Sequence, residues 1–335
     1  MWDPIPRDQA VISDARVLIT GGCGFIGSHL VRALEPDNEV RILDIDITED
    51  TPPGTVPIVG DIRDAETVAE AMAGVDIVFH QAASVDVKAS VTSPKSSHET
   101  NVTGTLNVLE AAREENPRLV VASSAAVYGD ANTVPIAETA PLEPNSPYGL
   151  EKSAADQYTR LYHDLYGLDT VPLRYFNVYG PGQRASTYSG VITNFVGQAR
   201  RGDPITIYGD GEQTRDFIHV DDVVTANLLA ATTDAVGKAY NVGTGKSVTV
   251  EKLAKLLRRL TGSNSEIVYT DPRPGDVRQS CAETTRAQEG LGFTSTVHVE
   301  DGLTALYGGP SRSSCGQHHP ILRSRQISLP RADES

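Results

Sequence analysis

Short apolar runs alternate with longer segments of mixed polarity through the first half of the chain. The apolar runs lie at residues 16–20, 39–44, 57–61, 75–80, 119–124 and 170–175. The segments 28–34, 65–72, 101–115 and 148–166 lie between them and are predicted to be helices. Nearly all-apolar strands that alternate with helices are typical of a parallel sheet covered on both faces. The pattern therefore predicts an α/β fold with a doubly wound parallel sheet.

The second half of the chain is richer in loops, glycine and proline. Helices are predicted at 191–201, 220–232 and 250–261, and a late strand at about 238–245. We expect residues 12–175 to form one domain, to which the late strand returns, and residues 176–306 to form a smaller α/β lobe. The stretch 307–335 has few apolar residues and no period, so it is predicted to be disordered.

Composition and charge narrow the class of protein. The 335 residues carry a net charge of −15, which argues against a nucleic-acid partner because phosphate backbones are bound by basic surfaces. No run reaches the ~18 apolar residues of a membrane span, and the first residues lack the pattern of a signal peptide. Three widely spaced cysteines, Cys23, Cys281 and Cys315, form no metal-binding motif. We therefore expect a cytoplasmic protein without membrane contact, disulfide framework or metal site.

A glycine-rich turn follows the first predicted strand and opens the first helix. Gly21, Gly24 and Gly27 have the spacing G-x-x-G-x-x-G, a variant of the dinucleotide fingerprint. Such a turn lets the backbone approach a pyrophosphate, whose charge is met by helix N–H groups. Tight turns also need glycine, so the spacing alone is weak. Asp44 ends the next strand, where a carboxylate binds the adenosine ribose and repels a 2′-phosphate. The context predicts a Rossmann-type domain that binds NAD rather than NADP.

Other strand ends extend this site, because ligands gather at the carboxyl ends of parallel strands. Asp61 and Ile62 end the third strand, where they could meet adenine. The small residues after His80 would let a cofactor lie close to the fourth strand. The predicted NAD-binding residues are Gly21, Gly24, Phe25, Ile26, Gly27, Asp44, Asp61, Ile62, Gln81, Ala82 and Ala83, together with Tyr148 and Lys152.

Tyr148 and Lys152 stand four residues apart, one turn of helix. Ser146 can cap that helix, and Pro147 suits its first position. A nearby ammonium and the helix N-terminus both favour the phenolate, so the pair could serve as a general base near neutral pH. By itself such a pair is more often part of a solvated amphipathic face. Ser124, at the end of the fifth strand, supplies a third group at the same sheet edge.

Four motifs together resemble the extended short-chain dehydrogenase/reductase family, and within it nucleotide-sugar epimerases of the UDP-glucose 4-epimerase type. They lie at residues 20–27, 123–129, 148–152 and 174–181, and the resemblance runs in order over about 15–305. It also includes 208–222 and 273–278. The resemblance implies bound NAD, a UDP-sugar substrate and a homodimer formed through the helices at 104–115 and 148–166. Members of the family continue as a helix after 300–304, whereas this chain breaks at Gly308.

The resemblance also implies a role for each matching residue. Tyr148 would take the proton of the sugar 4-hydroxyl, Lys152 would lower the pKa of Tyr148 and hold the nicotinamide ribose, and Ser124 would bind the 4-oxygen. Arg215 and Arg273 would bind the diphosphate, and Asp276 the uridine ribose. For Arg215, a structural ion pair with Asp216 or Asp222 is an equal alternative. The implied substrate-binding residues are Ser124, Asn177, Tyr208, Arg215, Arg273, Asp276 and Ser280.

The residues after Ser124 separate the branches of the family. Related 4,6-dehydratases carry an Asp-Glu pair there, whereas this chain has Ala125 and Ala126, which cannot transfer protons. An epimerase or simple reductase is therefore favoured. The small side chain of Ser280 would leave room for a 2-acetamido group. A reductase, a 4,6-dehydratase, a UDP-glucuronate epimerase or decarboxylase, and a non-catalytic NAD-binding regulator remain as alternatives.

Overall fold

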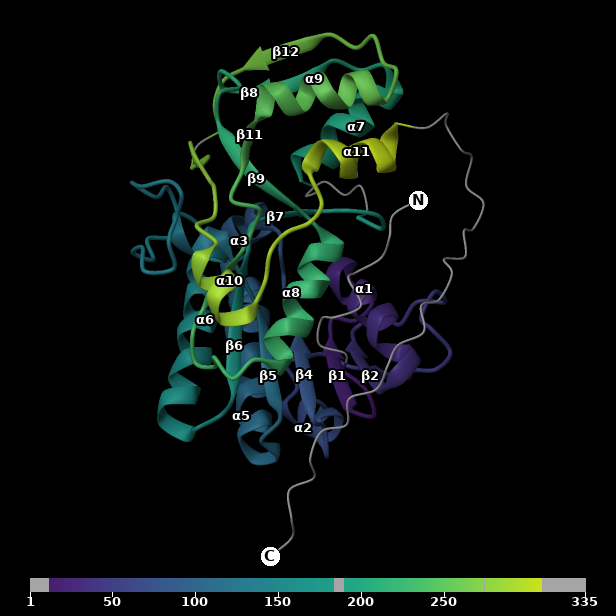
Figure 1. Cartoon of the computed structure of the whole chain (residues 1–335), viewed down its shortest axis with the longest axis vertical. Helices are drawn as coiled ribbons and strands as arrows, with labels where there is room; N and C mark the ends of the chain where they lie inside the picture. The colour runs from purple at the N-terminus through teal and green to yellow at the C-terminus, as the bar shows by residue number, and fades with distance from the viewer. Residues whose placement is uncertain (1–11, 184–189, 274, 309–335) are drawn as a thin grey trace, which may run out of the picture.

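Seven parallel strands form the central sheet of the protein (Figure 1). The computed structural model describes residues 12–183, 190–273 and 275–308. The strand order is β3-β2-β1-β4-β5-β6-β10. Their bounds are β1 (Arg16–Thr20), β2 (Glu39–Asp44), β3 (Val56–Val59), β4 (Ile77–His80), β5 (Arg118–Ser124), β6 (Thr170–Tyr175) and β10 (Tyr240–Val242). The doubly wound parallel sheet predicted from the apolar runs is confirmed.

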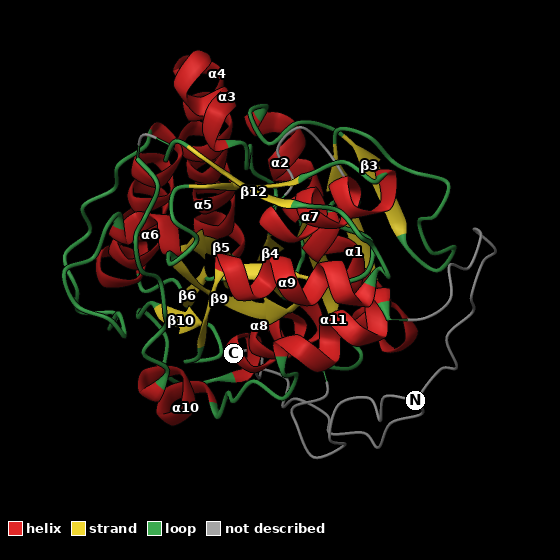
Figure 2. Ribbon diagram, turned by 90° about the horizontal axis from the view of Figure 1, so that it is seen from above, coloured by secondary structure: helices red, strands yellow, loops and turns green. Residues whose placement is uncertain are grey.

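Helices cover both faces of this sheet, as the view from above shows (Figure 2). On one face α1 (Phe25–Leu34) and α8 (Val220–Thr232) share an apolar core with the sheet. On the other face the core is formed by α2 (Ala65–Met72), α5 (Thr105–Glu115) and α6 (Pro147–Tyr166). Because both faces are buried, the strands are apolar on both sides, and β4 and β6 are buried at every position.

The strand order reverses at β1, which pairs with β2 on one side and β4 on the other. In open α/β sheets such a reversal opens a crevice at the carboxyl ends of the strands. The ends of β1, β2, β4, β5 and β6 therefore lie along one edge with the glycine turn. Short elements follow β4 and β5 and pack against α6: α3 (Val87–Thr92), α4 (Pro94–His98), the π-helical η2 (Glu99–Gly104) and the 3₁₀ helix η3 (Ala125–Tyr128).

The second half of the chain builds a separate lobe and also contributes to the sheet. In the lobe, β7 (Asn177–Tyr179), β9 (Thr214–His219) and β11 (Ser247–Thr249) form one small sheet, and β8 (Ile205–Tyr208) pairs with β12 (Ile267–Thr270). The helices α7 (Val191–Arg201), α9 (Val250–Leu260) and α11 (Val299–Tyr307) pack on them, at the top of Figure 1. In contrast, β10 lies beside β6, and α8 and α10 (Thr285–Leu291) join the core of the central sheet.

The C-terminal helix α11 includes Tyr307, so the predicted disordered stretch begins too early at residue 307. The helix starts with Glu300 and Asp301 in its first turn, where carboxylates complement the helix dipole. The remainder of the stretch, 309–335, lies outside the described residues. Among the described helices, none has the length and apolar character that a membrane crossing requires.

Candidate active site

The glycine turn brings three elements into close contact. Gly21 has a φ of +69°, and a Cβ there would lie 2.7 Å from the backbone nitrogen of Ala82. A Cβ on Gly27 would overlap the carbonyl oxygen of Gly21. Gly24 caps α1, which has no side-chain cap and no acidic residue in its first turn. The first N–H groups of α1 thus meet an open, glycine-lined approach, which fits the pyrophosphate of a dinucleotide.

Asp44 stands beside the turn, as predicted. Its Oδ2 accepts a hydrogen bond from the backbone N–H of Cys23 (2.9 Å), and the side chain is half-buried at the end of β2. Ala82 lies across the turn and donates its backbone N–H to Thr20 Oγ1 (3.3 Å). The position of Asp44 suits the hydroxyl groups of an adenosine ribose.

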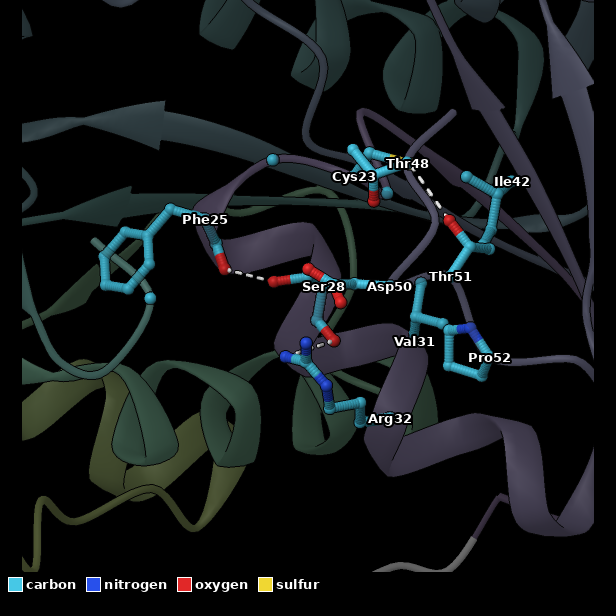
Figure 3. A pocket seen from close by; sticks show the side chains of 13 residues that line it. Cys23, Phe25, Ser28, Val31, Arg32, Ile42, Thr48, Asp50, Thr51 and Pro52 are labelled. Carbon is cyan, nitrogen blue, oxygen red and sulfur yellow. Dashed lines mark hydrogen bonds between the residues drawn. The ribbon is translucent and has the colours of Figure 1, made fainter. Parts of the chain in front are cut away.

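A cavity of about 420 Å³ opens next to the turn, between α1 and the loop at 48–52 (Figure 3). Its wall is partly polar. Cys23 Sγ lies 3.7 Å from Thr51 Oγ1, and Ser28 Oγ donates to the carbonyl oxygen of Phe25 (3.0 Å). The glycine turn therefore borders open space rather than packed side chains.

Three of the predicted cofactor residues have other contacts in the structure. Asp61 forms an ion pair with Arg63 (2.6 Å), and this guanidinium holds the pKa of the Asp61 carboxyl below its usual range. The side chain of Ile62 is buried in the core below η2. The Gln81 amide donates to Tyr175 Oη (3.1 Å) and Asn227 Oδ1 (3.2 Å), toward α8. These side-chain contacts link strand ends to neighbouring helices and strands.

The structure brings Ser124, Tyr148 and Lys152 together. The hydroxyl of Ser146 accepts the N–H of Gly149 (3.1 Å), so α6 begins at Pro147 and Tyr148 stands in its first turn, as predicted. The Tyr148 side chain lies near that of Ser124 at the end of β5, and this contact lowers the pKa of Tyr148. Lys152 is buried and donates from Nζ to the carbonyl oxygen of Ala122 (2.9 Å).

Burial shifts the pKa values of both Tyr148 and Lys152. Burial raises the pKa of Tyr148, and although the contact with Ser124 lowers it, the nearby Glu151 carboxylate raises it further. Burial also lowers the pKa of Lys152 to about 8, against the opposite effect of Glu151. Desolvation disfavours the phenolate, and the Lys152 ammonium donates to Ala122. The lowering of the Tyr148 pKa by Lys152 stays a prediction.

The buried residue His80, to which the sequence motifs assign no function, lies close to Lys152. His80 Nδ1 lies 2.7 Å from Thr20 Oγ1, and Nε2 lies 3.0 Å from Thr105 Oγ1. Thr105 donates its own proton to the carbonyl oxygen of Asn101, so it accepts from His80 Nε2–H. Burial first, and the charge of Lys152 second, lower the pKa of His80 to about 3.

A second residue that the motifs did not indicate supports the start of α6. Ser90 of α3 accepts the backbone N–H of Tyr148 at Oγ (3.1 Å). That N–H belongs to the first turn of a helix, which has no partner within the helix itself. No local sequence signal could have paired residues 58 positions apart.

The predicted substrate residues on the lobe are partly paired with one another. Arg215 forms an ion pair with Asp276 (2.5 Å). The alternative prediction of an ion pair with Asp216 or Asp222 is therefore wrong. Asp216 instead accepts the backbone N–H groups of Thr244, Gly245 and Ala282. Asp222 accepts those of Thr296 and Val297.

Arg273 lies over the ring of Tyr208 at 3.7 Å from its centroid, and the guanidinium lowers the pKa of that phenol. Asn177 donates to the carbonyl oxygen of Asp216 (3.1 Å). Ser280 is buried, and its backbone N–H donates to the carbonyl oxygen of Thr214 (3.2 Å).

The loop at 271–279 joins the lobe to the central domain. Asn145 donates to the carbonyl oxygen of Gly275 (3.0 Å), and the backbone N–H of Arg278 donates to Asp130 (3.1 Å). Arg278 also makes a two-pronged ion pair with Asp210 (2.7 and 2.9 Å). Asp130 and Asn145 lie in the segment between Ser124 and Tyr148. The loop that carries Arg273 and Asp276 is therefore attached to the segment that joins Ser124 to Tyr148.

Comparison with known proteins gives the family. The model of the NAD dependent epimerase/dehydratase family matches residues 17–243. A UDP-glucose 4-epimerase from Mycolicibacterium smegmatis is 36% identical over 301 residues, which are 86% of this chain and 96% of the relative. The crystal structure of a UDP-glucose 4-epimerase from Thermotoga maritima with UDP-glucose has a TM-score of 0.82 at 38% identity, over 86% and 96% of the two chains.

Two further comparisons bear on cofactor and branch. The UDP-glucose 4-epimerase of Thermus thermophilus in complex with NAD has a TM-score of 0.79 at 36% identity, over 86% of this chain and 96% of that one. A dTDP-glucose 4,6-dehydratase from Streptomyces griseus has a similar identity, 35% over 306 residues, which are 86% of this chain and 92% of the relative. The chain belongs to the NAD-dependent epimerase/dehydratase family, and NAD is its cofactor.

Proposed function

We propose that the chain is an NAD-dependent 4-epimerase of UDP-hexoses. The observation that carries this proposal is the convergence of Ser124 at the end of β5 with Tyr148 and Lys152 on the first turns of α6, with no acidic residue directly after Ser124. The position after Ser124 is occupied by η3, whose residues Ala125 and Ala126 cannot donate or accept protons. Elimination of water from the sugar needs such a proton donor and acceptor, whereas epimerisation does not.

Each residue has a defined part in the proposed reaction. The glycine turn and Asp44 would hold NAD, which would supply a hydride acceptor for C4 of the sugar and, once reduced, a hydride donor for the opposite face. Tyr148 Oη takes the proton of the 4-hydroxyl and gives it back, while the Ser124 hydroxyl holds the 4-oxygen by a hydrogen bond. The positive charge of oxidised NAD would favour the Tyr148 phenolate and so oppose the effect of burial on the Tyr148 pKa. The net redox change is nil, so NAD is expected to stay bound.

The lobe residues supply substrate recognition in this proposal. Arg215 and Arg273 bind the diphosphate, whose oxygens match guanidinium geometry, and Asp276 binds the ribose of uridine. Asn177 contacts the sugar and Tyr208 lies beside Arg273. Ser280 lines the sugar pocket, and its small side chain leaves room for an N-acetyl group. A relative of known structure described as a UDP-N-acetylglucosamine 4-epimerase, from Methanobrevibacter ruminantium, is 36% identical, which supports this extension.

The test is to incubate purified protein, without added NAD, with a panel of UDP-sugars and to determine the configuration at C4 by NMR. We expect interconversion of UDP-glucose and UDP-galactose, and of the two UDP-N-acetylhexosamines. Turnover of UDP-glucose without turnover of UDP-N-acetylglucosamine would refute the role of Ser280. Release of CO₂ from UDP-glucuronate, or a requirement for consumed NADH, would identify a decarboxylase or a reductase instead. A protein that binds NAD and changes none of the sugars would be a regulator.

We also propose a homodimer that uses α5 and α6. Large apolar side chains are exposed along α6 at helical spacing, namely Leu150, Tyr158, Leu161 and Leu165. Such a stripe on an otherwise polar helix marks an interaction surface.

A further inference from the structure

His29 of α1 is hydrogen-bonded to the loop that follows β7. Its imidazole Nε2 lies 2.9 Å from the carbonyl oxygen of Pro181, which is 152 residues further along the chain. A carbonyl oxygen can only accept, so Nε2 carries a proton and donates it. Burial lowers the pKa of His29 below its ordinary value, which favours the neutral imidazole. One bond thus joins the helix at the glycine turn to the smaller lobe.

The loop that His29 holds is part of the wall of the cavity beside the glycine turn. Gly182, directly after Pro181, lines the cavity of about 420 Å³ together with Phe25 and residues of the loop at 48–52. Gly182 has a φ of +82°, a conformation that suits glycine, and a Cβ there would lie 4.0 Å from His29 Nε2. The backbone therefore passes close to the imidazole at the place where it borders the cavity.

The same loop is anchored in the smaller lobe. Gln183 donates from Nε2 to the carbonyl oxygen of Val178 in β7 (3.3 Å), and its Oε1 accepts from Thr193 of α7 (3.4 Å). Asn177, which the resemblance implies as a substrate-binding residue, begins β7. The loop therefore belongs structurally to the lobe, and the His29 bond attaches it to α1.

Two neighbours of His29 favour this orientation of its ring. The ring of Phe25, one turn earlier in α1, meets the imidazole edge to face, with the ring centroids 5.9 Å apart. A carboxylate oxygen of Asp221, at the start of α8, lies 3.9 Å from His29 Nδ1. The His29 side chain is only 16% exposed. These contacts place Nδ1 toward α8 and leave Nε2 for the carbonyl oxygen of Pro181.

We propose that the hydrogen bond from His29 to Pro181 acts as a clasp that retains NAD in its cavity. His29 is a positioning residue, because it keeps the backbone of Pro181 and Gly182 against α1 as a wall of the cavity. Without the bond this wall can move away from α1, and NAD should dissociate faster. The inference needs NAD as the cofactor and not the proposed epimerisation, so either can fail while the other holds.

The first experiment measures the exchange of NAD bound to the holoenzyme. The protein is incubated with an excess of ¹⁴C-labelled NAD, and the label bound to it is followed with time, which gives the dissociation rate of the resident NAD. His29→Leu removes the donor, so exchange should be about 3- to 10-fold faster, the effect of one hydrogen bond. In His29→Gln the amide Nε2 can donate to the same carbonyl oxygen, so exchange should return toward the native rate.

The matched control is His163→Leu. His163 of α6 makes the same kind of bond, from Nδ1 to the carbonyl oxygen of Leu168 (2.9 Å), on the other face of the central sheet. Its loss should lower the thermal stability and leave NAD exchange unchanged. Native exchange in His29→Leu, no rescue in His29→Gln, or equally fast exchange in His163→Leu would each overturn the proposal.

Two measurements on the native protein cover the case in which His29→Leu does not fold. In ¹⁵N NMR of protein labelled at histidine, with the His29 signals assigned by their loss in His29→Gln, we expect a proton on Nε2 at pH 7. A bare Nε2 could not donate to Pro181 and would overturn the proposal. Backbone hydrogen exchange at residues 179–183 should slow when NAD is bound, and no dependence on NAD would overturn it as well. Neither measurement requires turnover of a UDP-sugar.

Discussion

Tyr148 is the residue on which the proposed chemistry depends most directly. Tyr148→Phe removes the hydroxyl that transfers the proton and keeps the ring, so turnover should fall by about 10²–10⁴-fold. NAD should stay bound, because the glycine turn and Asp44 are unaffected. The measurement is epimerisation rate together with NAD released on denaturation. Tyr158→Phe, on the exposed side of the same helix, is the matched control and should keep full activity. A fully active Tyr148→Phe protein would rule out the mechanism.

His80 should make the stability of the protein sensitive to acid. Its pKa falls from 6.5 to about 3 on folding, so between these values the unfolded chain binds a proton that the folded chain does not. Stability is therefore complete above about pH 6.5 and is lost as the pH falls toward 3, by up to about 1.4 kcal/mol per pH unit. Urea unfolding at several pH values measures this slope. His80→Gln should be flatter between pH 6 and 4, and an equal slope in both proteins would contradict the assignment.

Contacts between neighbours in the sequence could be predicted, whereas contacts between residues far apart in the sequence could not. Ser146 and Pro147 define the start of α6, and the glycine turn defines the start of α1. Both helix starts could be predicted because they depend on residues that are neighbours in the sequence. The partner of Arg215 is 61 residues away, and Ser90 lies 58 residues before Tyr148. The direction of the Tyr148 pKa shift depends on burial, which is a property of the folded packing and not of the spacing to Lys152.

At the scale of elements, α6 is fixed to the sheet by a buried ion pair. Asp156 accepts two hydrogen bonds from Arg174 of β6 (2.9 and 3.0 Å), and a third from Ser123 of β5 (3.0 Å). Asp156→Asn would leave the Arg174 guanidinium buried without a counter-charge, which costs about 3–5 kcal/mol. Thermal and urea unfolding measure the loss. The control Asp164→Asn changes a carboxylate near the end of the same helix that is exposed, and should be nearly neutral. A loss below about 1 kcal/mol in Asp156→Asn would show that the pair is not needed.

The apolar pattern predicts where strands and helices lie, because each element buries the apolar residues that it contains. The pattern does not predict which elements pack against one another. The alternation of apolar runs predicted all six early strands, and β10 as a late one. Nothing in the pattern shows that α8 and α10, which follow the lobe strands β8 and β9 in the sequence, pack on the central sheet. That placement depends on which apolar faces meet, as Val223, Ala226 and Ala287 do in one core.

At the scale of the whole molecule, the exposed apolar stripe on α6 predicts the oligomeric state. Leu161 and Leu165 are 45% and 62% exposed, although this helix is packed against α5 and the sheet on its other side. Water contact with such a stripe is unfavourable, and burial against a second copy would remove it. We expect the native protein to have twice the 35.8 kDa mass of one chain in light scattering.

The double variant Leu161→Glu/Leu165→Glu places four like charges in a symmetric interface of two copies, and should give monomers with an unchanged circular dichroism spectrum. Val59→Glu changes a residue of β3 that is 73% exposed and lies away from α6, so it controls for loss of exposed apolar surface in general. That control should remain dimeric. Because α6 also carries Tyr148 and Lys152, the monomeric variant further tests whether the helix holds its catalytic residues without a partner. Monomeric native protein, or a variant that stays dimeric, would exclude this face as the interface.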